Sequence, residues 1–506
     1  MLDTAIRPLF RFDNTYAREL SGLYKPWKPA ESRAPQLLFF NRPLAQELGL
    51  DAEALSGDAG AAIFAGNTVP EGAEPIAQAY AGHQFGGFSP QLGDGRALLL
   101  GEVLDAQGRR RDIAFKGSGR TPFSRGGDGK AAVGPMLREA IVSEAMHALG
   151  IPTTRALAVA ATGEQVVREE LLPGAVLTRV AASHLRVGTF QYFAARSELD
   201  KLRLLADYAI ARHDADLAGQ PGRYLELLRR VAQRQAVLIA QWMNIGFIHG
   251  VMNTDNMTIS GETIDYGPCA FMEAYDPKAV FSSIDSKGRY AFSNQPPIAQ
   301  WNLARLAEAL LPLMVEDESE AASEAAVAQA TEVISSFSAL YQAAALQGLR
   351  AKLGLGPVAA ADADAADGAL ANDWLGLLHA QGVDFTLGWR GLCNAAAGDD
   401  APLLALFTNT AALQAWLARW RARCEADGVG AGEGRAERMR RTNPWLIARN
   451  HRVEEALAAA TQGELGPFQR LMAALAHPYD ENPEFADYAE PAPAAVTACY
   501  QTFCGT

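Results

Sequence analysis

The stretch from His249 to Asn256, followed by Asp265-Tyr-Gly267, constrains the fold more than any other part of the sequence. Asn256 lies seven positions after His249, and a turn at residues 260–262 separates Asn256 from Asp265. Two short strands on either side of this turn would bring the Asn256 and Asp265 side chains to one site. Amide and carboxylate oxygens suit Mg²⁺, which takes few protein ligands. The stretch therefore predicts a Mg²⁺ site at Asn256 and Asp265, and the residues do not distinguish Mg²⁺ from Mn²⁺.

The spacing matches the HRDxxxxN and DFG segments with which protein kinases hold Mg²⁺ on nucleotide phosphates. One position departs from that pattern. The catalytic Asp of a kinase, two positions after the His, is replaced by Val251, which cannot accept a proton. Asp255, directly before Asn256, is the remaining carboxylate of this loop that could act as a base. The pattern predicts kinase-like nucleotide binding without the usual kinase base.

Lys116 closes an apolar strand segment, residues 111–116, as the phosphate-pairing lysine of a kinase does. In kinases a glutamate on the following helix anchors this lysine. A helix is predicted over residues 134–149, and it offers two glutamates. Helical periodicity places Glu144 within the apolar stripe, which suits a buried carboxylate, whereas Glu139 faces more nearly away. The residues alone leave both candidates open.

Two glycine clusters flank Lys116, Gly93-Asp94-Gly95-Arg96 before it and Gly126-Gly127-Asp128-Gly129 after it. Glycines let backbone N–H groups approach phosphates closely, and arginines grip phosphates with two hydrogen bonds. The first cluster precedes Lys116 at about the spacing of a kinase glycine-rich loop. Arg179 and Arg186 are further phosphate candidates. These residues together predict a binding site for a nucleoside triphosphate.

Length and composition limit the architecture and the partners. The chain has 506 residues, more than the ~250–300 at which single cores stop growing, so two or three packed lobes are expected. A net charge of −13 argues against nucleic acid or anionic lipid as a partner. Five cysteines without repeated spacing indicate a reducing compartment. With no secretory-type start and no long apolar run, a cytoplasmic protein that does not bind membranes is expected.

The order of elements predicts an α+β chain with a protein-kinase-like bilobal fold. A hairpin is expected from residues 97–103 and 113–115, and helices dominate beyond Asn302, with loops at 359–367 and 428–434. Four parts are predicted: an N-terminal wrapping segment (1–70), a β-rich N-lobe (71–180), a helical C-lobe with the metal loop (181–330), and a helical C-terminal extension with a cysteine-containing tail (331–506).

Four strings resemble the selenoprotein O family: QAYAGHQFGGFSPQLGDGRA at 78–97, FKGSGRTPFSR at 115–125, SEAM with LGIPTTRA within 143–156, and the segment 249–267. The likeness runs along nearly the whole chain and is weakest between residues 355 and 434. It implies a pseudokinase-type fold whose ATP lies flipped relative to kinases. The α-phosphate then faces a Ser, Thr or Tyr of a protein, so the expected enzyme is a protein adenylyltransferase.

The resemblance also assigns roles to residues of this chain. It pairs Lys116 with Glu139, against the periodicity that favours Glu144. It gives Asn256 and Asp265 to the metal and makes Asp255 the proton acceptor. It implies an ATP site made of Gly93, Gly95, Arg96, Lys116, Asp128, Gly129, Arg179, Arg186 and Asp265.

The cysteine-containing tail carries a separate hypothesis. Animal members of the family end with a selenocysteine, and bacterial relatives carry Cys near that place. Here the tail contains Cys499 and Cys504. We expect Cys504 to act as a redox handle that pairs with Cys269, just past Asp265, or with Cys499.

Four other functions remain open at this point. A conventional kinase is disfavoured by Val251 at the position of the catalytic Asp. A non-catalytic nucleotide-binding pseudokinase has no need of the metal pair Asn256 and Asp265. A small-molecule phosphotransferase would share the His-Gly and Ile-Asp-x-Gly patterns. Transfer of UMP with Mn²⁺, in place of AMP, is the fourth.

Overall fold

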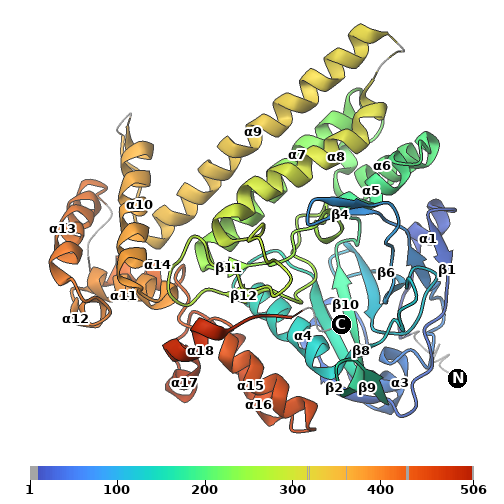
Figure 1. The fold of residues 1–506 in the computed structure, drawn as a ribbon, viewed down its shortest axis with the longest axis horizontal. Coiled ribbons are helices and arrows are strands. Elements are labelled where there is room, and N and C mark those ends of the chain that lie inside the picture. The colour runs from blue at the N-terminus through green and yellow to red at the C-terminus, as the bar shows by residue number, and fades with distance from the viewer. Residues whose placement is uncertain (1–8, 316, 318, 360–361, 429–431, 504–506) are drawn as a thin grey trace, which may run out of the picture.

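The computed structural model describes residues 9–315, 317, 319–359, 362–428 and 432–503. It combines one large β-sheet with many helices, a mixed α+β architecture (Figure 1). The sheet has the strand order β1-β3-β6-β7-β10-β9-β2, with β8 paired to β10, and its ladders are antiparallel. Its strands are β1 (Tyr24–Pro26), β2 (Gln36–Phe40), β3 (Ile76–Gln78), β6 (Ala97–Leu104), β7 (Arg110–Lys116), β8 (Ala131–Ala132), β9 (Arg155–Val167) and β10 (Leu171–Ala181).

The predicted hairpin is confirmed as β6 and β7. Gly108 has φ +76 in the connecting turn, a conformation that costs glycine nothing. Lys116 is the last residue of β7, and it lies opposite Ala97 of β6 and Leu177 of β10. Because β7 is an inner strand, its ladder partners on both sides fix the position of Lys116.

Helix α4 (Val133–Ala148) confirms the helix predicted over residues 134–149. Pro135 occupies its first turn, where its missing N–H would have no helical partner. The chain leaves the helix at Gly150, with φ +77. Helix α4 packs against β9 and β10 and also against α15 (Asn450–Thr461) and α16 (Gly466–Leu475).

This two-sided packing corrects the periodicity argument about the two glutamates. Every residue from Met136 to Ser143 is buried, so this part of the helix has no exposed face. Glu139, expected to face away from the core, is 3% exposed. A single apolar stripe describes a helix that packs on one side, and α4 packs on more than one.

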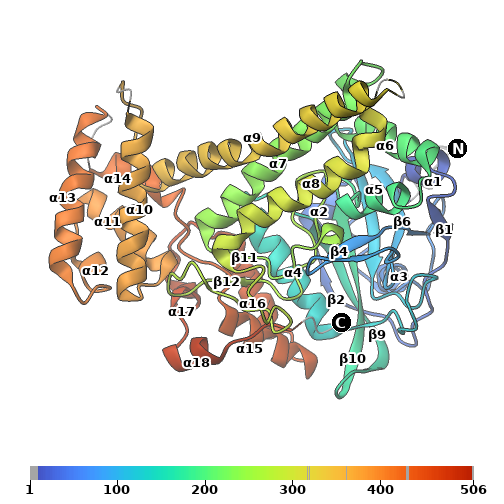
Figure 2. The same cartoon turned by 45° about the horizontal axis from the view of Figure 1, so that its top comes forward.

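After β10 the chain is mainly helical, and its helices between residues 363 and 440 lie far from the sheet (Figures 1 and 2). Helices α7 (Arg223–Ile245), α8 (Gln295–Met314) and α9 (Glu320–Lys352) pack side by side. The 33-residue α9 reaches a distal group of helices whose core contains Trp374, Trp389, Trp416 and Trp420. That group comprises α10 (Ala363–Gln381), α11 (Phe385–Ala397), α12 (Ala401–Leu404), α13 (Thr410–Ala426) and α14 (Glu433–Arg440).

One expectation about a loop between helices changes. The loop predicted at 359–367 is wrong in its second half, because α10 already begins at Ala363. Near the start of the chain, residues 9–70 supply β1 and β2 to the sheet. They also supply α2 (Arg42–Glu47) and α3 (Asp58–Phe64), whose apolar residues join a separate core with the sheet.

The remaining elements are short except for helix α6 (Leu199–His213), which has 15 residues. No helix within the described ranges is both long and apolar enough to cross a membrane. The short helices are α1 (Thr15–Glu19), α5 (Val187–Ala194), α17 (Ala486–Ala489) and α18 (Ala494–Cys499), and the short strands are β4 (Gly82–Gln84), β5 (Gly87–Ser89), β11 (Phe247–Ile248) and β12 (Ala270–Phe271).

Two helical glycines give a test of this packing. A Cβ on Gly188 in α5 would lie 2.1 Å from the carbonyl oxygen of Ala81, whereas a Cβ on Gly376 in α10 would meet nothing within 4 Å. Gly188→Ala should destabilise the protein by about 1–3 kcal/mol through overpacking. The matched variant Gly376→Ala should stabilise it by about 0.5–1 kcal/mol. Thermal unfolding midpoints of both variants check this, and equal shifts would contradict the placement of α5.

Candidate active site

One cavity of about 1490 Å³ lies between the sheet, α4, the loop from His249 to Gly267, called the metal loop after its predicted role, and the C-terminal residues. Val251, at the position of the missing kinase base, also lines it. Every predicted site residue that the structure describes lines this same cavity: Gly93, Gly95, Arg96, Lys116, Asp128, Gly129, Glu139, Arg179, Arg186, Asp255, Asn256 and Asp265.

A charged cluster forms the inner end of the cavity. Lys116 Nζ donates to Glu139 Oε1 at 2.6 Å and to Asp265 Oδ1 at 2.7 Å. Arg179 Nη1 donates to the same Asp265 oxygen at 2.8 Å. Glu139 Oε1 also accepts the backbone N–H of Tyr266 at 3.2 Å. The sheet, α4 and the metal loop therefore meet at these side chains.

Glu144, the other glutamate of α4, belongs to a different contact. Its carboxylate accepts hydrogen bonds from Arg155 Nη2 at 2.7 Å and from Asn41 Nδ2 at 2.8 Å. Glu144 is not among the residues that line the cavity. In the structure, Glu139 is therefore the helix partner of Lys116.

Asp265 adopts a left-handed backbone conformation with φ +63, which is uncommon for a residue other than glycine and is often found at functional sites. Burial opposes its ionisation, but Lys116, Arg179 and Arg186 hold the pKa of Asp265 well below its usual value. Among the described residues, its carboxylate hydrogen bonds all involve Oδ1. Oδ2 therefore remains available to a cation.

The metal loop differs from the predicted pair of strands. Asn256 ends a 3₁₀ turn, Thr254–Asn256, and residues 249–269, all within the described ranges, form only isolated bridges. The loop is held instead by side chains: His249 Nε2 donates to the carbonyl of Ile264 at 2.9 Å. Asn256 Nδ2 donates to the carbonyl of Val251 at 3.1 Å, which orients the amide of Asn256.

The donor set suits Mg²⁺. The described residues include no cluster of three or more His, Cys, Asp or Glu side chains that could hold a metal ion. A site made of one amide and one carboxylate oxygen fits an ion that keeps several waters and binds substrate phosphates. Asn256 Oδ1 and Asp265 Oδ2 are the atoms of this chain that could supply those ligands.

Asp255 sits beside this pair under the β4–β5 hairpin. Its Oδ2 accepts from Gln84 Nε2 at 3.3 Å, and its Oδ1 has no hydrogen-bond partner within the described part of the chain. Burial raises the pKa of Asp255 to about 6. A Cβ on Gly82 would lie 2.6 Å from Oδ1, so only glycine leaves that oxygen its space. Sequence reasoning assigned no role to Gln84 or Gly82, although both lie in the 78–97 string.

Arg186 is the most enclosed of the candidate phosphate-binding residues, with 2% exposure. Its guanidinium lies 4.5 Å from the centre of the Tyr80 ring, and its Nη1 is 3.7 Å from Asp94 Oδ1. Its Nε and Nη1 have no hydrogen-bond partner among the described residues. Tyr80 and Asp94 therefore hold a cation that still has N–H donors without a partner among the described residues, and the sequence had suggested no role for either side chain.

The two glycine clusters form loops with close backbone approaches. Gly93 has φ +82, and a Cβ there would lie 2.4 Å from Cγ of Phe123. Gly129 has φ +67, and its Cβ would lie 2.1 Å from the carbonyl oxygen of Gly119. Asp128 Oδ2 pairs with Arg168 Nη1 at 2.9 Å. Side chains at either glycine would force these loops apart.

The C-terminal residues supply a wall of the cavity that sequence reasoning missed. Arg138 of α4 donates to the carbonyl of Gly267 at 3.0 Å and to Glu454 of α15 at 2.9 Å. Glu454 also accepts from the hydroxyl of Tyr500 at 2.8 Å. Arg138 and Glu454 are 316 positions apart, and local sequence carries no signal for such a contact.

The cysteine hypothesis is not tested by these contacts. Cys504 lies outside the described residues. Cys269 is buried, and burial raises the pKa of its thiol to about 12, whereas Cys499 is exposed. The pairing of Cys504 stays a prediction.

Comparison with known proteins gives a consistent result. The family model described as "Protein adenylyltransferase SelO" matches residues 9–476. A Cereibacter sphaeroides protein named "Protein nucleotidyltransferase YdiU" is 61% identical over 498 residues, covering 98% of this chain and all of that protein. Proteins of the same name from Chromobacterium violaceum and Rhizobium meliloti are 60% identical over 484 residues and 56% over 500. They cover 96% and 98% of this chain and 99% of each relative.

The two glutamates of α4 provide a matched test of the site. Glu139→Ala leaves Lys116 with one carboxylate partner and should weaken ATP binding at least tenfold, because Lys116 then turns toward Asp265. Glu144→Ala breaks a less buried ion pair outside the cavity, so it should change thermal stability but leave ATP affinity within about twofold. Calorimetric titration with ATP and Mg²⁺ measures both. A larger loss of affinity in Glu144→Ala would contradict this assignment.

Proposed function

Since this chain belongs to the family of protein adenylyltransferase SelO and is therefore a nucleotidyltransferase, we propose that it transfers AMP from ATP to Ser, Thr or Tyr hydroxyls of acceptor proteins and releases pyrophosphate. One observation carries the proposal. The cavity is lined by Val251 at the position of the kinase base, and the buried cations Lys116, Arg179 and Arg186 line the same cavity.

The cations favour pyrophosphate as the leaving group. Lys116, Arg179 and Arg186 are 7%, 3% and 2% exposed, so they act in an environment of low dielectric constant. Negative charge develops on the β-phosphate oxygen as its bond to the α-phosphorus breaks. Fixed donors stabilise a transition state most where charge appears during the reaction. Binding of the β- and γ-phosphates to these cations would leave the α-phosphate toward the acceptor hydroxyl.

Asp255 is the proton acceptor in this proposal. The acceptor oxygen forms a bond to the α-phosphorus, the bond to the pyrophosphate oxygen breaks, and the hydroxyl proton passes to Asp255. Support comes from Oδ1 of Asp255, which has no protein partner in the described ranges, while Gln84 holds Oδ2. Proton transfer to a positioned side chain typically contributes 10²–10⁴-fold to a rate.

Mg²⁺ is the proposed cofactor, held by Asn256 and Asp265, and Mn²⁺ would fit the same oxygen ligands. When bound, the ion supplies positive charge to the triphosphate. The protein residues orient it: Asn256 is fixed through Val251, and Asp265 through Lys116 and Arg179.

A protein-kinase-like bilobal arrangement accompanies this proposal. Lys116 on a central strand, Glu139 on α4 and the loop from His249 to Gly267 correspond to the kinase elements in kind and order. The strands of the large sheet lie within residues 24–181, and the helices that follow carry the metal loop. We place the N-lobe at 71–180 and the C-lobe at 181–330, with 331–506 as the C-terminal region.

The identity of the transferred group is directly measurable. Incubation with Mg²⁺ and ATP labelled at the α-phosphate should label the chain itself or an acceptor protein, with a mass increase of one AMP and release of pyrophosphate. Label from the γ-phosphate would make the protein a kinase. Binding without either label would make it a scaffold. A parallel reaction with UTP and Mn²⁺ distinguishes UMP transfer.

Substitutions of Asp255 and Asp265 should distinguish a loss of AMP transfer from a loss of ATP binding. Asp255→Asn keeps an acceptor for Gln84 but removes the base, so kcat should fall about 10²–10⁴-fold while ATP affinity stays within about threefold. Asp265→Ala removes the metal ligand and the partner of Lys116 and Arg179, so binding and turnover should both be lost. Calorimetry and AMP-transfer rates on folded variants check both. Asp255→Asn with parental kcat would exclude Asp255 as the base.

A further inference from the structure

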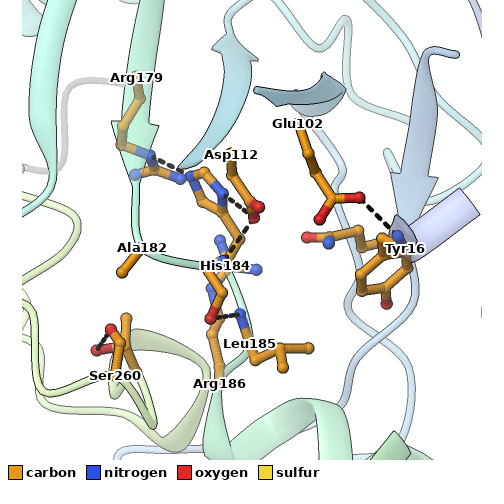
Figure 3. A network of polar contacts seen from close by, with 12 residues as sticks. Tyr16, Glu102, Asp112, Arg179, Ala182, His184, Leu185, Arg186 and Ser260 are labelled. Carbon is orange, nitrogen blue, oxygen red and sulfur yellow. Dashed lines mark hydrogen bonds and ion pairs between the residues drawn. The ribbon is translucent and has the colours of Figure 1, made fainter. Parts of the chain in front are cut away.

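The side chain of Arg179 contacts His184, a histidine that does not line the cavity (Figure 3). The Nη1 group of Arg179 donates to Asp265, and its Nε donates to His184 Nε2 at 3.3 Å. Figure 3 shows His184 between Arg179 on one side and Asp112 on the other. His184 is 3% exposed and Asp112 is 2% exposed.

The hydrogen bonds determine the form of the His184 ring. Burial opposes ionisation of Asp112, but the Arg212 guanidinium and the N–H groups of His184 hold the pKa of Asp112 at about 2. His184 Nδ1, 3.0 Å from Asp112 Oδ2, must therefore carry the proton that is donated to this carboxylate. Arginine can only donate, so Nε2 must present its lone pair to Arg179. Burial lowers the pKa of His184, which keeps the ring neutral.

Asp112 is itself fixed by two elements. Its Oδ1 accepts from Arg212 Nη2 at 2.5 Å, and its Oδ2 also accepts the backbone N–H of His184 at 2.9 Å. Arg212 contacts Glu102 as well, and Glu102 accepts the backbone N–H of Tyr16 at 2.6 Å (Figure 3). A continuous set of buried hydrogen bonds thus runs from α1 through β6, β7 and α6 to Arg179.

We propose that the Asp112–His184 pair positions Arg179 for the triphosphate. His184 accepts the hydrogen bond from Arg179 Nε, which fixes the orientation of the guanidinium. In this orientation the Nη groups of Arg179 face Asp265 and the cavity. His184 is a positioning residue, because it touches neither the cavity nor the metal loop carboxylate. Orienting the guanidinium in advance reduces the entropy lost when phosphate binds. The inference rests on the proposed function only in assigning Arg179 to the phosphates.

The closing experiment measures nucleotide binding by calorimetry and does not use AMP transfer as its readout. His184→Leu removes the acceptor at similar volume and should weaken binding of ATP with Mg²⁺ about tenfold. AMP, which lacks the β- and γ-phosphates, should bind within about twofold of the parent. His184→Gln restores an acceptor near Nε2 and should keep ATP affinity within about threefold. His213→Leu is the matched control, since His213 bonds Ser183 and not Arg179.

A double-mutant cycle tests whether His184 acts through Arg179. If it does, Arg179→Met with His184→Leu should bind ATP as weakly as Arg179→Met alone, because the effects of coupled residues do not add. Additive losses would overturn the inference, as would a folded His184→Leu with parental ATP affinity. If His184→Leu does not fold, His184→Gln provides the test. If this variant lost affinity for ATP and for AMP by the same factor, His184 would have a structural role alone, and the inference would be wrong. Failure to transfer AMP would overturn the proposed function and leave this result unaffected.

Discussion

Lys116 and Arg179 both donate to one oxygen of Asp265, and this contact holds together the elements that line the cavity. Lys116 ends β7 and Arg179 lies on the adjacent strand β10, so the sheet sets their separation. Asp265 comes from the loop that follows α7, and Glu139 of α4 completes the pairing. Breaking a buried ion pair by removing one partner typically costs about 3–5 kcal/mol. Sheet, helix and loop are therefore fixed to one another by charge as well as by apolar packing.

The sequence predicted what depends on neighbouring residues. The hairpin of β6 and β7 follows from two apolar runs around Gly108, and α4 follows from its periodicity between Pro135 and Gly150. Chain order also indicated that Lys116 and the loop from His249 to Gly267 would share a site. Helical periodicity could not predict which glutamate pairs with Lys116, Glu139 or Glu144. The reason is that α15 and α16, far along the chain, bury a second side of α4.

Side chains that act through others were also out of reach of the sequence. His184 matters because β7 and α6 bring Asp112 and Arg212 to it, and Gln84 because the β4–β5 hairpin lies on the metal loop. The net charge of −13 describes the surface and gives no information about these interior groups. Arg186, Arg179 and Lys116 are cations inside an acidic protein, each with a carboxylate beside it.

The wall of the cavity formed by α15 and the tail has a consequence for biosynthesis. Glu454 and Tyr500, which contact Arg138, are made long after Asp265. At about 5–20 residues per second of translation, the interval from Asp265 to Tyr500 is on the order of tens of seconds. During that time the nascent chain has the residues of the cluster around Asp265 but not the wall of the cavity that α15 and the tail supply. The cavity is thus complete only after Tyr500 has been synthesised, long after the residues of the charged cluster.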